Sequence, residues 1–173
     1  MSKRVPSPLA RLAWVILLIN VLPAARAEEP ETVVSTDAHT EHPWLFHLIQ
    51  ADLWQAALDG NTEYYPPTYD QDGFTHATAN PALLLNVANH FYTDVPGEWR
   101  CLRMTVESLA AAGVETVFEG TAPVGDKQPD FEGTDDELFP HVLGGIPPSA
   151  VLEVHEVIRA DDGTFLRVVG VTD

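Results

Sequence analysis

The chain of 173 residues contains a single cysteine, Cys101. One cysteine cannot form a disulfide within a molecule, so the fold must depend on a hydrophobic core and not on covalent cross-links. Cys101 lies in the apolar run of residues 99–106, which is typical of a small buried side chain rather than a nucleophile. The folded part must therefore be long enough to build one complete core.

The first 27 residues have the three parts of an export signal. Three basic side chains occur in the first eleven residues, and the run Leu12–Leu22 is apolar apart from Asn20. Pro23 follows, and Ala25–Ala27 (Ala-Arg-Ala) has the small residues that a signal peptidase requires. An uncleaved anchor is the alternative, but an apolar run of this length spans only about 16 Å of a hydrocarbon core roughly 30 Å thick. We expect cleavage after Ala27 and a mature protein in the periplasm or the medium, free of the membrane.

Acidic residues dominate the expected mature protein. The export segment holds four of the nine basic residues and none of the 26 acidic ones, which leaves five basic residues, 26 acidic residues and a net charge of −21. Such a charge disfavours nucleic acids and anionic membranes as partners. A solvated, mutually repelling surface is the simplest interpretation, and a small molecule is the partner class that stays open. The sequence does not indicate an oligomeric state.

The mature chain divides into a tether and one domain. Residues 28–43 hold five acidic residues, two His and two Pro, and bury too little apolar surface to offset the entropy of ordering. We expect this tether to be flexible. Compact structure is predicted from Trp44 to Asp173 as a single domain.

Short elements of both kinds follow one another from Trp44. Apolar runs and alternation predict strands, and apolar residues recurring on one face predict helices. Asn80-Pro81 is a clear helix start, with Asn as the cap and Pro in the first helical position. The predicted strands are residues 44–49, 74–78, 100–106, 114–118, 151–159 and 164–169; the two main helices are residues 51–58 and 81–92; residues 64–67 and 120–136 are loops. Strands predominate, so the fold class is α+β.

Three histidines stand in apolar surroundings. His47 lies within the first predicted strand, His76 lies on the strand 74–78, and His141 follows Pro140 in what reads as a loop. A buried histidine is costly unless its ring nitrogens have partners. Two roles are therefore open for each of these histidines: a structural role, with partners inside the protein, or a role in a binding site. No pair of histidines has the close spacing of a metal site outside the tether, so no metal centre is predicted.

A set of motifs in a fixed order resembles a known bacterial family. The motifs are His47, Trp54, Tyr65-Pro66-Pro67, Gly73-Phe74-Thr75-His76, Asn86-Val87-Ala88-Asn89-His90-Phe91-Tyr92 and Glu137-Leu138-Phe139-Pro140-His141-Val142-Leu143-Gly144-Gly145-Ile146-Pro147. Together they closely resemble the family catalogued as domain of unknown function 952 (DUF952), over about residues 44–157. Leu143 stands where the usual family pattern has a Tyr, so a hydroxyl expected in the family's pocket is missing here.

The resemblance implies a fold similar to the catalytic core of ADP-ribosyltransferases. That fold is a compact α+β domain with a split, mostly antiparallel sheet and two main helices, and it holds a nicotinamide dinucleotide in a cleft. His47 matches in type the first-strand residue that hydrogen-bonds the ribose, and Thr75 to Thr78 match the strand near the nicotinamide. The rings of Tyr64, Tyr65 or Tyr69 are candidates to cover the nicotinamide. Glu137 is the candidate for the catalytic carboxylate.

Two functions of different classes follow. The first is a domain that binds a polar small molecule, with a nucleotide as one candidate, in a His-lined cleft; its ligand-binding residues would be His47, Tyr65, Thr75, His76, Thr78 and His141. The alternative is an ADP-ribosyltransferase-like enzyme that uses NAD and in which Glu137 is catalytic. The binding domain is favoured because the catalytic glutamate is not clearly identifiable.

Overall fold

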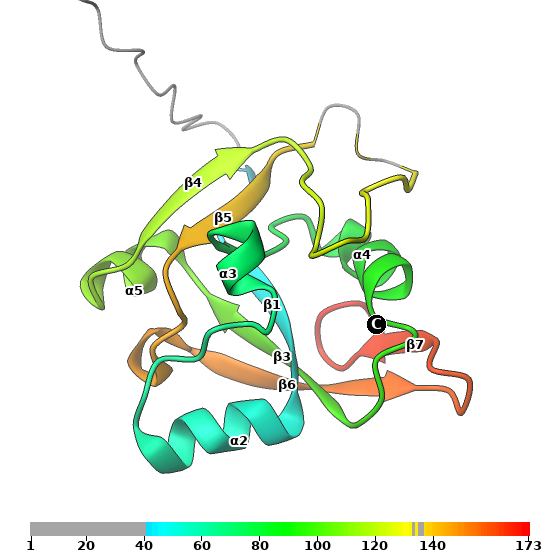
Figure 1. Cartoon of the computed structure of the whole chain (residues 1–173), viewed down its shortest axis with the longest axis horizontal. Helices are drawn as coiled ribbons and strands as arrows, with labels where there is room; N and C mark the ends of the chain where they lie inside the picture. Colours follow the sequence, from blue (N-terminus) through cyan, green and yellow to red (C-terminus); the bar gives the residue numbers. More distant parts are fainter. Residues whose placement is uncertain (1–40, 133, 135–136) are drawn as a thin grey trace, which may run out of the picture. The chain divides into compact units, whose positions relative to one another are not determined.

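Antiparallel strands in two separate sheets form the framework of the computed structural model, which describes residues 41–132, 134 and 137–173 (Figure 1). The predicted export segment and most of the predicted tether lie outside these residues. The first sheet has the order β1 (Leu45–Gln50), β3 (Trp99–Met104), β6 (Glu153–Arg159) and β7 (Phe165–Val168). The second has the order β2 (Thr75–His76), β5 (Phe139–Leu143) and β4 (Glu115–Glu119).

The two sheets meet at one pair of residues. The main-chain N–H of Phe46 in β1 donates to the carbonyl of Thr78 at 2.8 Å, and the N–H of Thr78 donates back to Phe46 at 2.9 Å. This antiparallel pair follows directly after β2, so the outer edge of the first sheet touches the second sheet here. The predicted split, mostly antiparallel sheet is therefore present as two sheets.

The helices are short, and capping residues mark where several of them begin or end. The helix α2 (Ala51–Gly60) buries Trp54 and Ala57 and ends with Asn61 in the left-handed conformation. The Asn80 side chain accepts from the N–H of Ala82 and begins a 3₁₀ turn, Pro81–Leu83, that continues as α4 (Leu84–Phe91). The shorter helices are α3 (Tyr69–Asp72) and α5 (Val106–Ala111). Among the described residues no helix is both long enough and apolar enough to cross a lipid bilayer.

The alternation of β1 divides the core into two clusters. Leu45 and Ile49 point into one cluster with residues of α2, α5 and the second sheet, whereas Phe46 and Leu48 point into the other with residues of α4, β6 and β7. Cys101 is fully buried in this second cluster, as its sequence context predicts, and burial raises the pKa of its thiol to about 12. The thiol is therefore inert at neutral pH.

Two expectations about local structure are wrong, and two short helices were not expected. His141 lies in β5 and not in a loop, although Pro140 precedes it. Pro140 has no N–H, so it accepts from Ala77 but returns no hydrogen bond, which explains why the ladder between β2 and β5 stops there. The strand predicted to reach residue 106 ends at Met104, because Thr105 caps α5 instead. The helices α3 and α5 were not predicted.

Candidate functional site

The ladder between β1 and β2 opens one step beyond the Phe46–Thr78 pair. In a continuous antiparallel ladder the next hydrogen-bonded pair would join Leu48 to His76. The alternation of the strands directs the N–H and C=O groups of both residues toward this gap, because the neighbouring residues pair with β3 and β5. Leu48 stands opposite Cys101 of β3 but, like Phe46 two residues before it, turns its N–H and C=O away from that strand, and among the described residues no other main-chain group pairs with them. We call this unpaired step, Leu48 opposite His76, the opened ladder.

The side chain of His47 occupies part of the gap. Its Nδ1 lies 2.6 Å from the main-chain oxygen of His76, the group that would otherwise accept from Leu48. A carbonyl oxygen only accepts, so Nδ1 carries the proton and Nε2 carries a lone pair. Nε2 is buried without a hydrogen-bond partner. Burial lowers the pKa of His47 to about 4, so the ring is neutral at pH 7 and offers an acceptor.

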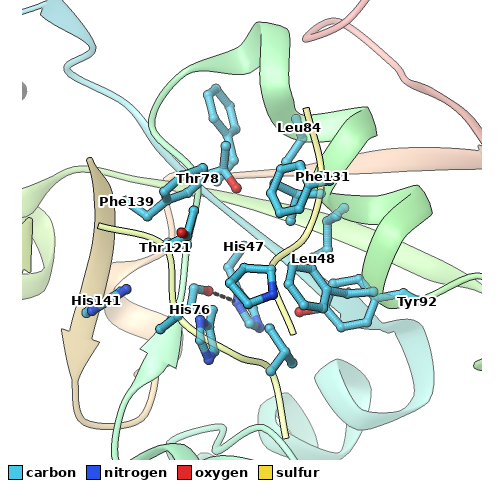
Figure 2. Close-up of a pocket in the computed structure, with 17 residues that line it drawn as sticks. His47, Leu48, His76, Thr78, Leu84, Tyr92, Thr121, Phe131, Phe139 and His141 are labelled. Atoms are coloured by element: carbon cyan, nitrogen blue, oxygen red, sulfur yellow. Dashed lines mark hydrogen bonds between the residues drawn. The ribbon is translucent and has the colours of Figure 1, made fainter. Parts of the chain in front are cut away.

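Two hollows of different size flank the opened ladder. The larger, which we call the large cavity, has a volume of about 320 Å³. Its walls include Tyr64, Pro66, Pro67, Tyr92, Val95 and Trp99. The smaller, which we call the small compartment, has about 30 Å³ and lies between α4, the second sheet and the segment 120–131 (Figure 2). Both hollows are lined by His47, Leu48, His76, Tyr92 and Val124, so the opened ladder faces each of them.

The histidines are the titratable groups in the lining that change charge closest to neutral pH, and they are neutral at pH 7. No lysine or arginine is among the described residues that line either hollow. Burial raises the pKa of Tyr64 and Tyr92 above the usual range and lowers that of His76 and His141, so all four side chains are neutral at pH 7. A volume of 320 Å³ falls within the range of ligand sites, and its aromatic walls favour a flat, uncharged molecule.

His76 and His141 are each held by a carboxylate. His76 Nε2 lies 3.1 Å from Asp72 Oδ2, and His141 Nδ1 lies 3.0 Å from Glu119 Oε2. The carboxylates accept, so the two rings adopt opposite tautomers. The Nε2 atom of His141 is left buried and unpartnered. The ring centroids of His76 and His141 are 5.8 Å apart, and Phe74 stacks on His141 at 3.9 Å.

Four of the predicted ligand-binding residues come together. His47, His76, Thr78 and His141 all line the small compartment, and the first two also line the large cavity. Figure 2 shows these four around the compartment, with the His47 hydrogen bond dashed. The separation of the histidine rings is therefore compatible with one shared site.

The other predicted residues lie elsewhere. Tyr65 is 49% exposed, and its hydroxyl donates to Glu63, while its neighbour Tyr64 lines the large cavity. Thr75 is fully buried and donates to the carbonyl of Gly144 at 2.7 Å. These two side chains have structural contacts and line neither hollow.

The position of Glu137 offers no support for a catalytic carboxylate. Its side chain accepts from the Asn80 amide at 3.4 Å, and it lines neither of the two hollows. Leu143, which replaces the tyrosine of the family pattern, is 45% exposed. Leu143 lines neither of the two hollows.

Several lining residues had no signal in the sequence. Leu48 contributes its main chain, which no pattern of side chains marks. Trp99 and Tyr92 were not among the predicted binding residues; they pack together with ring centroids 5.1 Å apart, and both line the large cavity. The indole nitrogen of Trp99 is buried without a partner. Among the described residues, no three His, Cys, Asp or Glu side chains are arranged to hold a metal ion.

Comparisons with known proteins bear on family and fold. The crystal structure of protein CC0527 from Caulobacter crescentus is similar, with a TM-score of 0.54 and 17% sequence identity over 71% of this chain and 93% of that one. The structure of a double mutant of CC0527 gives the same values. At this identity the likeness concerns the fold alone. Curated proteins provide no match.

The family comparison covers all of the motifs quoted above except His47. The model of the family described as "Protein of unknown function (DUF952)" matches residues 48–154, which is more than half of the chain. The match contains the region of His76 and His141 and begins at Leu48. Similarity to the ADP-ribosyltransferase core is not part of these findings and stays a prediction. The chain belongs to the DUF952 family.

Proposed function

We propose that this domain binds an uncharged small molecule through a group that both donates and accepts hydrogen bonds, such as a carboxamide or a lactam. The observation that carries the proposal is the opened ladder. Leu48 leaves one main-chain donor and one acceptor unpaired beside a cavity of about 320 Å³. Unpaired buried main-chain groups are costly, and a ligand that pairs with both removes that cost.

The chemistry of the walls favours an uncharged ring over a phosphate. A phosphate or carboxylate would need cations or several convergent donors, and the part of the chain that the structure describes places no lysine or arginine on the walls of either hollow. Tyr64, Tyr92 and Trp99 instead provide aromatic surface for a flat ring. The lone pair of His47 Nε2 adds a further acceptor for a donor on the ligand.

The geometry of the opened ladder and the two hollows also bears on nucleotide binding and on the NAD-using alternative. Nicotinamide carries a carboxamide on a flat ring, so it fits the chemistry of the opened ladder. The pyrophosphate of NAD finds no cation in the described lining, and Glu137 lies outside both hollows. We therefore favour binding of an uncharged ligand without turnover.

Titration with two related molecules tests the proposal. We expect nicotinamide to shift the amide N–H resonance of Leu48 in ¹⁵N-resolved NMR spectra. Nicotinic acid, which has the same ring but a negative charge and no amide donor, should bind at least tenfold more weakly. Equal binding of the two, or binding that leaves Leu48 unshifted, would contradict recognition at the opened ladder.

The same titration with NAD distinguishes the two functional classes. Binding of NAD without release of nicotinamide supports a binding domain. Release of nicotinamide that is lost in a His47→Leu variant would instead support the enzyme, and a Glu137→Gln variant would then show whether this carboxylate takes part.

We also propose that the domain functions outside the cytoplasm. The support is the basic, apolar and small-residue pattern of residues 1–27 and the acidic charge of the rest of the chain. Expression in a bacterial host followed by fractionation tests it: we expect periplasmic or secreted protein whose N-terminus is Glu28. Cytoplasmic protein that retains residues 1–27 would contradict this.

A further inference from the structure

The small compartment differs in chemistry from the large cavity. Its outer walls are apolar side chains from α4, from β5 and from the segment 120–131. They are Leu84, Val87, Phe91, Val124, Phe131 and Phe139. Most of its polar groups, among them Thr78 and His47, lie on the side of the two sheets, and Thr121 adds one hydroxyl from the segment 120–131 (Figure 2). A molecule that entered it from the opened ladder would therefore meet mainly hydrocarbon.

The two hollows adjoin each other at the opened ladder. Leu48, His76 and Tyr92 line both, so a ligand whose polar group pairs with the Leu48 main chain has the large cavity on one side and the small compartment on the other. The aromatic walls of the large cavity suit a ring. The apolar walls of the small compartment suit an alkyl or acyl group.

We propose that the small compartment receives an apolar arm of the ligand, so that the ligand class is an amphipathic, uncharged amide or lactam. This inference rests on the proposed recognition of the polar group at the opened ladder. It adds that an alkyl or acyl substituent is recognised separately, by burial against Leu84, Phe91 and Phe131.

The size of the compartment sets the length of the arm. Its volume is about 30 Å³, and each water-sized group needs roughly 10–15 Å³ of such space. An arm of about two carbons therefore fits the compartment as it stands. A longer arm must displace the segment 120–131, which forms the outer wall.

Hydrogen bonds hold this outer wall in place. The N–H of Gly125 donates to Asp72 Oδ1 at 3.0 Å, and the other oxygen of Asp72 holds His76. His90 Nε2 lies 2.6 Å from the carbonyl of Gln128, and Lys127 donates to the carbonyl of Phe91 at 3.0 Å. Asp72 is the buried member of these contacts, with 4% side-chain exposure, so it is the residue that resists a longer arm.

A series of unbranched primary amides, from acetamide to octanamide, tests the inference. Each methylene that enters the compartment should raise the affinity about fourfold. We expect this rise for the first members and then a plateau, with resonance shifts at Leu84 and Phe131 as well as at Leu48. A Phe131→Ala variant enlarges the compartment and should move the plateau to longer chains.

Two further variants examine the outer wall. Asp72→Ala removes the bond to Gly125 and should also move the plateau to longer chains. Gln71→Ala is the matched control: it lies on the same helix and also removes a bond to the segment 120–131, the one to Asp126, but that bond is exposed, so the plateau should move far less than in Asp72→Ala. Circular dichroism establishes that each variant is folded, and Phe131→Ala provides the test if Asp72→Ala is not.

The outcomes separate this inference from the proposed function. Amides that shift Leu48 but bind equally well at every chain length would overturn the apolar arm and leave recognition at the opened ladder intact. Chain-length dependence with shifts at Trp99 and Val95 but not at Phe131 would place the arm in the large cavity and also overturn the inference. Absence of any shift at Leu48 across the series would overturn both.

Discussion

His47 donates its Nδ1 proton to the main-chain oxygen of His76, across 2.6 Å, and thereby takes the place of a main-chain hydrogen bond between two sheets. The imidazole keeps the sheets linked while the ladder itself is open. The cost is an unpaired Leu48 main chain and a buried Nε2 atom on His47. Such a cost at the edge of a cavity is what a ligand can recover.

The two histidines should show opposite tautomers. His47 donates from Nδ1 to a carbonyl, whereas His76 donates from Nε2 to Asp72. We therefore expect ¹⁵N NMR at pH 7 to find the proton on Nδ1 of His47 and on Nε2 of His76. The same tautomer in both rings would contradict this hydrogen-bond scheme.

Acid should destabilise the domain below about pH 6.5. The folded pKa of His47 is lowered to about 4 by burial, so between pH 6.5 and 4 the unfolded state binds the proton and the folded state does not. Stability is fully present above the unfolded pKa and falls as the pH drops through this window, by roughly 3 kcal/mol for His47. Burial lowers the pKa of His76 and His141 too, which acts in the same direction.

Urea unfolding at several pH values measures this slope. A His47→Leu variant cannot bind a proton at this position, so its unfolding free energy should fall less steeply with decreasing pH than that of the wild-type chain. A stability that stays constant from pH 6.5 to 4.5 would show that His47 is not buried in its neutral form.

Replacing Arg159 with lysine should destabilise the fold by about 2 kcal/mol or more. The guanidinium donates to the main-chain carbonyls of five residues, four in the loop after α4 and one in the turn between β6 and β7. An ammonium group cannot reproduce this pattern. These carbonyls belong to Tyr92, Thr93, Val95, Gly97 and Gly163. Thermal unfolding measures the effect. Arg167→Lys, at a 52% exposed side chain 3.8 Å from Asp173, is the matched control and should change little.

An alanine at Gly145 should disturb the large cavity. Its Cβ would lie 2.8 Å from the main-chain oxygen of Tyr64, which pairs with Ile146. Overpacking of this kind costs about 1–3 kcal/mol. We expect a lower melting temperature and a displaced Tyr64 resonance. Gly120→Ala, whose Cβ would meet nothing within 4 Å, is the control and should leave both unchanged.

Local patterns predicted most of the elements correctly. The helix start at Asn80-Pro81 and the strands around His47 and residues 151–159 are confirmed, because caps, breakers and alternation are local properties. The short helices α3 and α5 escaped prediction. Each spans six residues or fewer, and a helix this short is stabilised by its tertiary contacts more than by its own sequence.

The candidate site was predicted only in part. Three histidines and Thr78 stand out in the sequence because polar residues in apolar runs need partners. Nothing in the sequence distinguishes Tyr64 from its neighbour Tyr65. In the folded domain Tyr64 lines the large cavity, whereas Tyr65 is exposed to solvent. Leu48 acts through its main chain, so no side-chain pattern marks it.

The sequence by itself determined the family, the α+β class and the need for a core without disulfides, because motifs, periodicity and a single cysteine are properties of the chain alone. Only the tertiary structure decided where the ladder opens. That depends on His47 reaching the carbonyl of His76, a residue 29 positions away in the chain. The pattern of side chains along the sequence predicts helices and strands. It does not predict which main-chain groups of distant strands pair, because that depends on how the two sheets meet.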